Sequence, residues 1–499
     1  MPKITIDGKT IELPAGATIL QAAQALGIYI PRYCYHPALS VSGTCRMCAV
    51  EVEKAPKLQI ACATEIADGM IARTDTAAVK KARKDVLEFL LANHPVDCPI
   101  CDQAGECSLQ NYYMDYGLHK SRVAPEDKIQ RSKRRAAGRY LVLDNERCIL
   151  CTRCVRFCDE VTKTNELTVS GRSDASFIDI KEGKSLDNDY SLNIAELCPV
   201  GAFTSRDFRF KQRVWFLKKI KSVCTGCAAG CNIEVHYNEN TVYRVMPSPN
   251  PETNTWLCDR GRMTYKDLQA GDRLHKAFVK KGSMEIEPAI RHAAHLLDEA
   301  ARKTGPESVA VLGSPYLSIE DNLALAELAA TSLKTPNLCL DFPRVQGVKD
   351  GILINKDDAS DANGLKLLKA RYAGLDQGAL VELINSGRIK LIVAEAKALS
   401  SIKDKLRELS NIETVILAVT KSDLDFESAC VLPYAANFET EGHFVNYKGL
   451  VQKTTPSVAA PDGVKPLWTV LSKLSSSTGA PIRLEDAAKL RERISEFIK

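Results

Sequence analysis

NHPVDCPICDQAGECSLQ, residues 93–110, and ERCILCTRCVRFC, residues 146–158, each carry several cysteines at short, regular intervals. Such runs are typical of loops that wrap an iron–sulfur cluster. Along the whole chain, fifteen of the eighteen cysteines and one histidine fall into four sets with this kind of spacing. The sequence therefore predicts a protein that binds several iron–sulfur clusters.

The composition is that of a globular protein with several domains. A length of 499 residues suggests three to five folded units, and the 45% hydrophobic and 26% charged fractions are ordinary. No apolar run approaches the roughly 18 residues of a membrane span, and the N-terminus lacks the apolar core of a signal peptide. We therefore expect a cytoplasmic chain, and in a reducing compartment many cysteines indicate metal ligands rather than disulfides.

Residues 1–78 form the first predicted domain. A hairpin around Asp7-Gly8 and a short helix ending at Gly27 are how a β-grasp [2Fe–2S] ferredoxin begins. Four candidate ligands follow, with ten, two and thirteen residues between them: Cys34, Cys45, Cys48 and Cys62. Tetrahedral zinc is the alternative, although zinc sites usually pair two C-x2-C knuckles and this set has one.

Residues 79–118 form the second predicted domain, in which an amphipathic helix ended by Pro95 precedes a mixed ligand set. This set contains one imidazole and three thiols: His94, Cys98, Cys101 and Cys107. An imidazole can replace a thiolate at iron, and it raises the reduction potential because it removes a negative charge. A zinc site of the same composition is not excluded by the motif alone, but the neighbouring motifs favour a [4Fe–4S] cluster.

Residues 119–210 form a predicted ferredoxin-like domain with a [4Fe–4S] cluster. Its ligands are a C-x2-C-x2-C run and a remote cysteine followed by proline: Cys148, Cys151, Cys154 and Cys198. Cys158 ends the run, but residues 159–197 contain no cysteine for a second cluster. We therefore predict that Cys158 is a buried structural thiol.

Residues 217–273 hold the fourth set, for a further [4Fe–4S] cluster, with a zinc ribbon as the alternative. Its members have two, three and twenty-six residues between them: Cys224, Cys227, Cys231 and Cys258. Only Cys339 and Cys430 lie beyond this set, which indicates a domain boundary near residue 270. In residues 274–499, apolar strands alternate with helical segments and predict an α/β domain with buried parallel strands at 305–314, 390–397 and 414–420.

The four sets, in this order, resemble the iron–sulfur G subunits of respiratory NADH:quinone oxidoreductase, complex I. The resemblance covers residues 1 to about 273. It implies one [2Fe–2S] cluster in the first set and three [4Fe–4S] clusters in the others, with His94 as a ligand. The fourth set resembles the Mo/W bis-MGD-type cluster module of molybdopterin oxidoreductases, and residues 431–452 resemble a segment of the same superfamily.

The fold class expected from these features is α+β followed by α/β. A β-grasp ferredoxin domain, a helical segment, a ferredoxin-like domain and the molybdopterin-type cluster module precede a reduced, degenerate molybdopterin-oxidoreductase-like domain. We expect no molybdopterin there, because no thiolate stands where that family has its metal ligand. Arg260 also replaces the lysine usual in cofactor-binding relatives.

The resemblance also implies what the chain does: it relays single electrons as a subunit of an NADH-oxidising translocase. It has no catalytic residue of its own, and no Gly-rich nucleotide loop follows a strand in its cofactor half. Electrons from NADH pass through FMN on a flavin partner subunit to the [2Fe–2S] set. They continue to the Cys148 set and the His94 set, and reach quinone through further iron–sulfur subunits. The fourth set lies off this route.

The resemblance further implies a place in the peripheral arm, on the cytoplasmic side of the inner membrane, with membrane contact only through partners. Basic stretches at 128–139 and 206–221 carry no nucleic-acid motif. We expect them to be solvated linkers that dock against acidic partner surfaces, without nucleic acid. The alternatives are the equivalent relay subunit of an NAD-linked hydrogenase or formate dehydrogenase, and a zinc-bound scaffold without a redox role.

Overall fold

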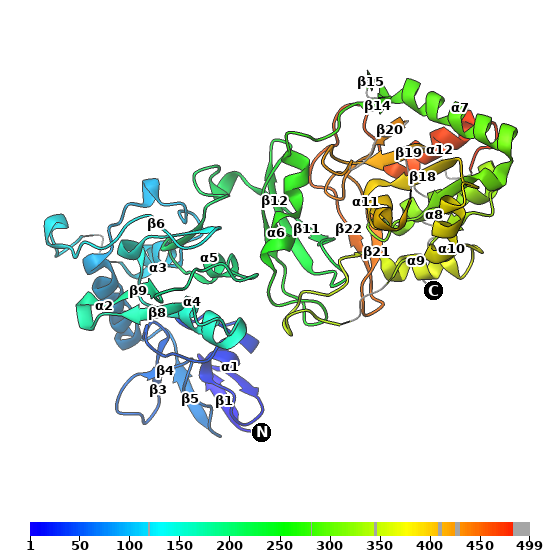
Figure 1. The fold of residues 1–499 in the computed structure, drawn as a ribbon. Coiled ribbons are helices and arrows are strands. Elements are labelled where there is room, and N and C mark those ends of the chain that lie inside the picture. Colours follow the sequence, from blue (N-terminus) through cyan, green and yellow to red (C-terminus); the bar gives the residue numbers. More distant parts are fainter. Residues whose placement is uncertain (118–119, 281, 344–346, 408–411, 425–429, 483–499) are drawn as a thin grey trace. The chain divides into compact units, whose positions relative to one another are not determined.

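The computed structural model describes residues 1–117, 120–280, 282–343, 347–407, 412–424 and 430–482. The chain divides into two compact units, Met1–Leu217 and Lys218–Lys499, and Figure 1 traces the elements of each. Among the described residues, no helix has the length and apolar character that a membrane crossing requires.

The first unit begins with the predicted hairpin and helix. Strands β1 (Lys3–Ile6) and β2 (Lys9–Glu12) are antiparallel, and positive φ angles at Asp7 and Gly8 close the two-residue turn between them. Helix α1 (Ile19–Ala25) starts at a capping box, in which Thr18 and Gln21 exchange hydrogen bonds. Both predictions are confirmed.

A five-stranded sheet completes this first domain. Its further strands are β3 (Ala49–Val52), β4 (Gln59–Ile60) and β5 (Met70–Arg73). The order is β2-β1-β5-β3-β4, with β5 parallel to β1. Fully buried aliphatic side chains of the sheet pack against α1 and form the core that supports the cysteine loop.

Two helices follow the sheet. Helix α2 (Ala77–Asn93) is capped by Thr76 and ends just before Pro95, as predicted. Helix α3 (Ser108–Tyr116) packs against α2, and the chain between them contains the 3-10 turn Cys98–Ile100. The second ligand set therefore lies on the loop that joins two packed helices.

Short elements surround the third set. Strands β6 (Arg135–Ala136), β7 (Leu141–Leu143) and β10 (Phe203–Ser205) form one antiparallel sheet, and β8 (Leu167–Ser170) pairs with β9 (Phe177–Ile180). Helix α4 (Arg153–Arg156) continues from the cysteine run, and α5 (Asn193–Leu197) leads directly into Cys198.

The second unit begins with an antiparallel sheet of three strands. They are β11 (Lys218–Val223), β12 (Asn232–Asn238) and β13 (Thr241–Pro247), followed by the short helix α6 (Asp259–Met263). Strand β12 begins directly after Cys231.

A seven-stranded sheet in the order β15-β14-β20-β19-β18-β16-β17 organises the rest of the unit. These strands are β14 (Ala277–Val279), β15 (Gly282–Met284), β16 (Val309–Leu312), β17 (Leu338–Cys339), β18 (Leu391–Glu395), β19 (Glu413–Ala418) and β20 (Cys430–Pro433). The pairings from β17 through β20 are parallel, so the three predicted parallel strands are confirmed.

Helices cover both faces of this sheet. They are α7 (Ile286–Thr304), α8 (Ile319–Glu327), α9 (Ala362–Lys369), α10 (Gln377–Asn385), α11 (Ala396–Ser400) and α12 (Leu467–Ser477). Alternate strand residues enter two separate cores, one with α7, α8, α9 and α12 and the other with α10 and α11. A two-stranded ribbon, β21 (Gly442–Val445) and β22 (Val451–Thr454), lies outside the sheet.

Candidate iron–sulfur cluster sites

The first set brings four thiols together in two hydrogen-bonded pairs. The Cys45 thiol donates to the Cys34 sulfur and thereby lowers the pKa of Cys34 to about 5, against the opposing effect of burial. The Cys62 thiol likewise lowers the pKa of Cys48 to about 7. Each pair is close enough to act electrostatically on the other. Four soft donors therefore face one small, buried space.

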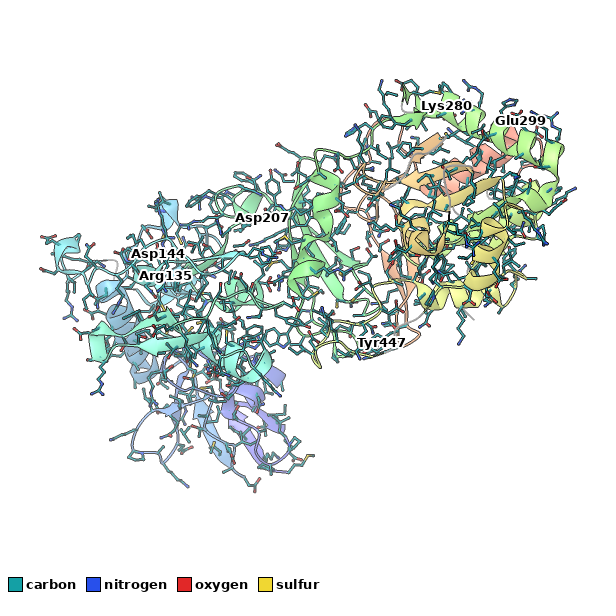
Figure 2. The ribbon with its side chains drawn as sticks, viewed as in Figure 1. Arg135, Asp144, Asp207, Lys280, Glu299 and Tyr447 are labelled. Atoms are coloured by element: carbon teal, nitrogen blue, oxygen red, sulfur yellow. The ribbon has the colours of Figure 1, made fainter. Side chains whose placement is uncertain are left out.

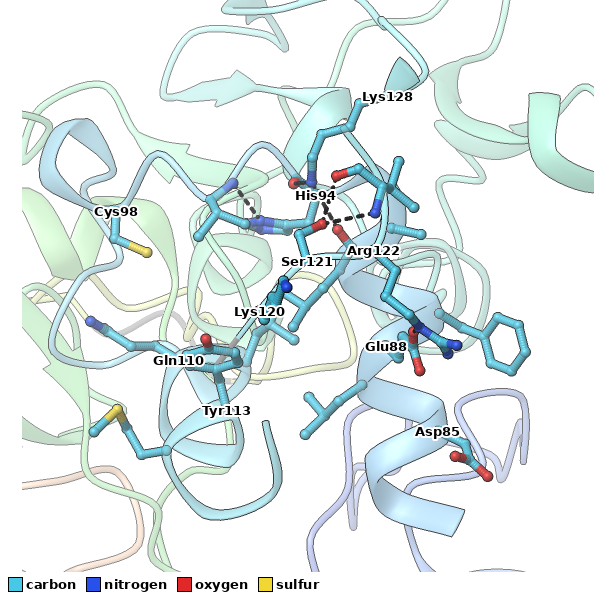
Figure 3. Close-up of a pocket in the computed structure, with 18 of the residues that line it drawn as sticks. Asp85, Glu88, His94, Cys98, Gln110, Tyr113, Lys120, Ser121, Arg122 and Lys128 are labelled. Atoms are coloured by element: carbon cyan, nitrogen blue, oxygen red, sulfur yellow. Dashed lines mark hydrogen bonds and ion pairs between the residues drawn. The ribbon is translucent and has the colours of Figure 1, made fainter. Parts of the chain in front are cut away.

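The second set lies between α2 and α3. His94 ends α2, and its Nδ1 accepts a hydrogen bond from the Val96 N–H at 3.1 Å. Burial lowers the pKa of His94 to about 4, so the imidazole is neutral at pH 7, which is the protonation state that metal binding requires. His94 and Cys98, both labelled in Figure 3, line one cavity of about 850 Å³, which Cys107 also lines.

The third set is a tight loop closed by a remote cysteine. Left-handed backbone at Leu150 and Thr152 turns the chain between the cysteines of the run, and the Leu150 N–H donates to the Cys148 sulfur at 3.4 Å. Cys198 ends α5 and accepts backbone hydrogen bonds, which lower its pKa, although burial is the larger effect and raises it. All four sulfurs lie within electrostatic range of one another.

The fourth set belongs to the second unit. Cys224 ends β11, and Cys258 begins α6. Backbone N–H groups point at two of the sulfurs: Gly226 donates to Cys224 at 3.4 Å, and Gly261 donates to Cys258 at 3.3 Å. All four cysteines of this set line one small cavity with Arg260, Leu353 and Ile354.

The donor sets fit iron–sulfur clusters. Burial raises the pKa of most of these thiols, for example to about 11 for Cys151 and Cys258. Crowded thiolates are therefore stable only beside a compensating positive charge such as iron. In the described part of the chain, no three His, Cys, Asp or Glu side chains converge on a point where one metal ion could sit. Such a point is not needed for a [4Fe–4S] cluster, because each ligand of that cluster binds a different iron atom.

Arginines inside the third motif tie it to the first set. Arg156 Nη2 donates to the carbonyl oxygens of Cys34 at 2.6 Å and Cys151 at 3.3 Å. Arg153 donates to the Tyr35 carbonyl at 2.6 Å and to the Leu197 carbonyl at 3.2 Å. Each guanidinium therefore holds one backbone segment from each of two cysteine sets.

A buried ion pair ties the third set to the second. Arg147, next to Cys148, donates two hydrogen bonds to Asp97, next to Cys98, at 2.9 and 2.6 Å. Gly201, near Cys198, also lies against the second set, since a Cβ at Gly201 would lie only 2.3 Å from Cys101 Sγ. The sequence did not predict these bridging contacts of the arginines. Their position inside or beside each motif was the available signal.

Some cations of the basic stretch at 128–139 contact this chain itself, and docking of the stretch on a partner stays a prediction. Lys128 donates to carbonyl oxygens at the end of α2, and Arg135, labelled in Figure 2, pairs with Asp179 at 2.5 Å. Several of these cations therefore bind this chain itself.

The three remaining cysteines are buried, and burial raises their pKa values. Cys158 is fully buried with a pKa of about 12, and its thiol donates to Glu166 Oε2 at 3.8 Å. Burial likewise raises the pKa of Cys339 to about 11 and that of Cys430 to about 12. All three are neutral, unreactive thiols near pH 7.

Four families match the chain in succession. In chain order their descriptions are "2Fe-2S iron-sulfur cluster binding domain" (residues 2–77), "NADH-ubiquinone oxidoreductase-G iron-sulfur binding region" (83–122), "NADH-quinone oxidoreductase subunit 3, ferredoxin-like domain" (138–204) and "Molybdopterin oxidoreductase Fe4S4 domain" (217–269). Each match contains all four candidate ligands of one set.

Relatives from a fungus and a bacterium align with two thirds of the chain. The 78 kDa subunit of mitochondrial NADH-ubiquinone oxidoreductase from Neurospora crassa is 39% identical over 350 residues, which cover 68% of this chain and 46% of the relative. The G-type subunit of NADH-quinone oxidoreductase from Rickettsia felis is 37% identical over 334 residues, 66% of this chain and 49% of the relative. The aligned region thus spans about half the length of each relative.

A solved chain of an NAD+-reducing [NiFe]-hydrogenase in the H2-reduced state is 30% identical. That match covers 43% of this chain and 91% of the hydrogenase chain, with a TM-score of 0.38. The order of the four matched families, together with the relatives above, shows that this chain belongs to the family of G-type iron–sulfur subunits of NADH-quinone oxidoreductase, the 75–78 kDa subunits of complex I.

Proposed function

We propose that the chain is the iron–sulfur relay subunit of an NADH:quinone oxidoreductase, with one [2Fe–2S] and three [4Fe–4S] clusters held by the sixteen residues of the four sets. When bound, the clusters supply one-electron transfer from a flavin subunit that oxidises NADH toward iron–sulfur subunits on the quinone side. The observation that carries this proposal is the linkage among the three sets of the first unit. Arg156 and Arg153 join the first set to the third, and the Arg147–Asp97 pair joins the third set to the second.

The residues of the chain do three things in this function. The cysteines and His94 provide buried or partly buried ligands, and metal binding would remove the protons of the thiols. Backbone N–H groups at Leu150, Gly226 and Gly261 donate to sulfur and stabilise negative charge there. The arginine bridges fix the spacing between sets, on which the rate of electron transfer depends. The protein thus insulates and positions the clusters, and the clusters carry out the redox chemistry.

The fourth set has a different role in this proposal. It belongs to the second unit, in which Arg260 pairs with Asp358 at 2.5 Å beside the set. An arginine held by a carboxylate is poorly placed to serve a second cofactor. We therefore propose that this cluster is structural and that the second unit is a degenerate molybdopterin-oxidoreductase-like domain without molybdopterin. The first domain is proposed to be a β-grasp ferredoxin fold.

Isolation of the native complex under anaerobic conditions tests the proposal. We expect a brown sample that dithionite bleaches, electron paramagnetic resonance (EPR) signals of one [2Fe–2S] and of several [4Fe–4S] clusters, and co-purifying flavin and membrane subunits. A colourless, zinc-loaded chain would refute the redox role. A soluble assembly with a hydrogenase or formate dehydrogenase subunit would keep the clusters but replace quinone as the acceptor.

A further inference from the structure

The hydroxyl of Tyr33 has no partner in the described part of the chain. Tyr33 directly precedes Cys34, and its side chain is fully buried. Its hydroxyl oxygen makes no hydrogen bond with any described residue. A buried hydroxyl without a partner lowers the stability of the fold, so such groups are rare and usually have an unseen acceptor.

The two sides of Tyr33 face different ligand sets. Its backbone N–H donates to the sulfur of Cys45, a proposed [2Fe–2S] ligand. Its ring packs against Tyr112 of α3, with the ring centroids 5.1 Å apart and the planes tilted by 59°. Helix α3 begins directly after Cys107, a proposed ligand of the second set.

Electrostatics agree with this placement. Tyr112 and two candidate ligands lie within electrostatic range of the Tyr33 phenol, with Cys107 of the second set ahead of Cys45 of the first. The phenol therefore lies within range of both sets. Among the residues that the structure describes, no polar group forms a hydrogen bond with this hydroxyl, which leaves sulfur as the acceptor that the surroundings offer.

We propose that the Tyr33 hydroxyl donates a hydrogen bond to a sulfur of the cluster held by the His94 set, on its Cys107 side, while the Tyr33 backbone N–H serves the [2Fe–2S] cluster. This inference rests on the proposed function, since it requires both clusters. A donor to sulfur stabilises the more negative, reduced cluster and raises its potential. Tyr33 is thus a positioning residue that tunes the cluster of the second set from within the loop of the first.

The neighbouring tyrosines supply matched controls. The Tyr112 hydroxyl already pairs with the Tyr29 hydroxyl at 2.5 Å and accepts the Arg32 N–H at 3.1 Å. The substitution Tyr112→Phe removes this hydroxyl, keeps an aromatic ring against Tyr33 and removes no proposed hydrogen bond to a cluster. Tyr33→Phe also keeps the ring and removes only the proposed donor.

The test is a redox titration of both variants in the assembled complex, followed by EPR. In Tyr33→Phe we expect the reduction equilibrium of the His94-set cluster to fall about tenfold, equivalent to about 59 mV for one electron. The [2Fe–2S] signal should stay unshifted, as should both signals in Tyr112→Phe. We also expect electron–nuclear double resonance of the His94-set cluster to show an exchangeable proton that Tyr33→Phe lacks.

Three outcomes overturn the inference. They are an unshifted potential in Tyr33→Phe, an equal shift in Tyr112→Phe, and a shift confined to the [2Fe–2S] cluster. Each leaves the cluster assignments intact. A wild-type complex without an EPR signal from the His94 set would instead refute the proposed function together with this inference.

Discussion

Arg147 binds Asp97 through two parallel hydrogen bonds, from Nε at 2.9 Å and from Nη2 at 2.6 Å, and the arginine side chain is only 3% exposed. Each residue directly precedes a cysteine of a different set. The pair therefore fixes the distance between two proposed clusters with the most directional ion pair that proteins use.

Asp97→Asn should weaken this link. Removal of one partner leaves the Arg147 charge buried with only Asp144, at 3.7 Å, and we expect a loss of about 2–3 kcal/mol of stability. The EPR signal of the His94 set should broaden or diminish. Lys81→Gln serves as the control, because its pair with Asp85 is exposed and should contribute less than about 1 kcal/mol. Equal effects of the two substitutions would contradict the role of the pair.

Gly201→Ala should abolish the second cluster. The added methyl group would lie 2.3 Å from Cys101 Sγ, so the cysteine has to leave its position. We expect iron content to fall and the signal of this set to disappear, while the [2Fe–2S] signal stays. Gly271→Ala, at a position with open space around it, should leave every signal unchanged. A normal spectrum for Gly201→Ala would show that Cys101 is not fixed as the structure places it.

His94→Cys should keep a cluster and lower its potential. A thiolate adds a negative charge where the neutral imidazole had none, and this disfavours the reduced state. A redox titration followed by EPR measures the shift. An unchanged potential would count against His94 as a ligand.

Cys227→Ala should spare NADH-driven quinone reduction in complexes that assemble. The fourth set belongs to the second unit and is proposed to be structural. Cys101→Ala, in the relay, should by contrast abolish the activity. Quinone reduction is assayed together with subunit content, and a large loss in an intact Cys227→Ala complex would falsify the structural role.

The second unit should lose stability in mild acid through His236. Its side chain is 2% exposed, its Nδ1 accepts from Arg244 Nε at 3.0 Å, and burial lowers its pKa from 6.5 to about 4. Between pH 6.5 and pH 4, His236 is protonated in the unfolded chain but neutral in the folded chain. The free energy of unfolding therefore falls as the pH drops from 6.5 toward 4. From pH 7 to pH 5 we expect a loss of about 2 kcal/mol.

Urea unfolding of the second unit at both pH values measures this loss. His236→Gln keeps a polar side chain of similar size but does not titrate, so its loss between pH 7 and pH 5 should be smaller by that amount. An identical pH dependence in the two proteins would assign the effect to other groups.

The sequence by itself determined the local parts of this protein. Ligand spacing, the Asp7-Gly8 turn, the end of α2 before Pro95 and the buried strands of the second unit all depend on residues close together in the chain. Each follows from local geometry or from hydrophobic periodicity. The four candidate ligand sets could be written down for the same reason, since most of their members share one loop.

Only the tertiary structure decided which sets are neighbours and what joins them. Arg156 reaches Cys34 across 122 positions and Arg147 reaches Asp97 across 50, and no spacing rule predicts such contacts. The structure likewise shows that the buried hydroxyl of Tyr33 has no hydrogen-bond partner among the described residues, which no local sequence pattern predicts. Contacts between charged or buried residues that are far apart in the sequence depend on how the chain packs. That packing links the three sets of the first unit.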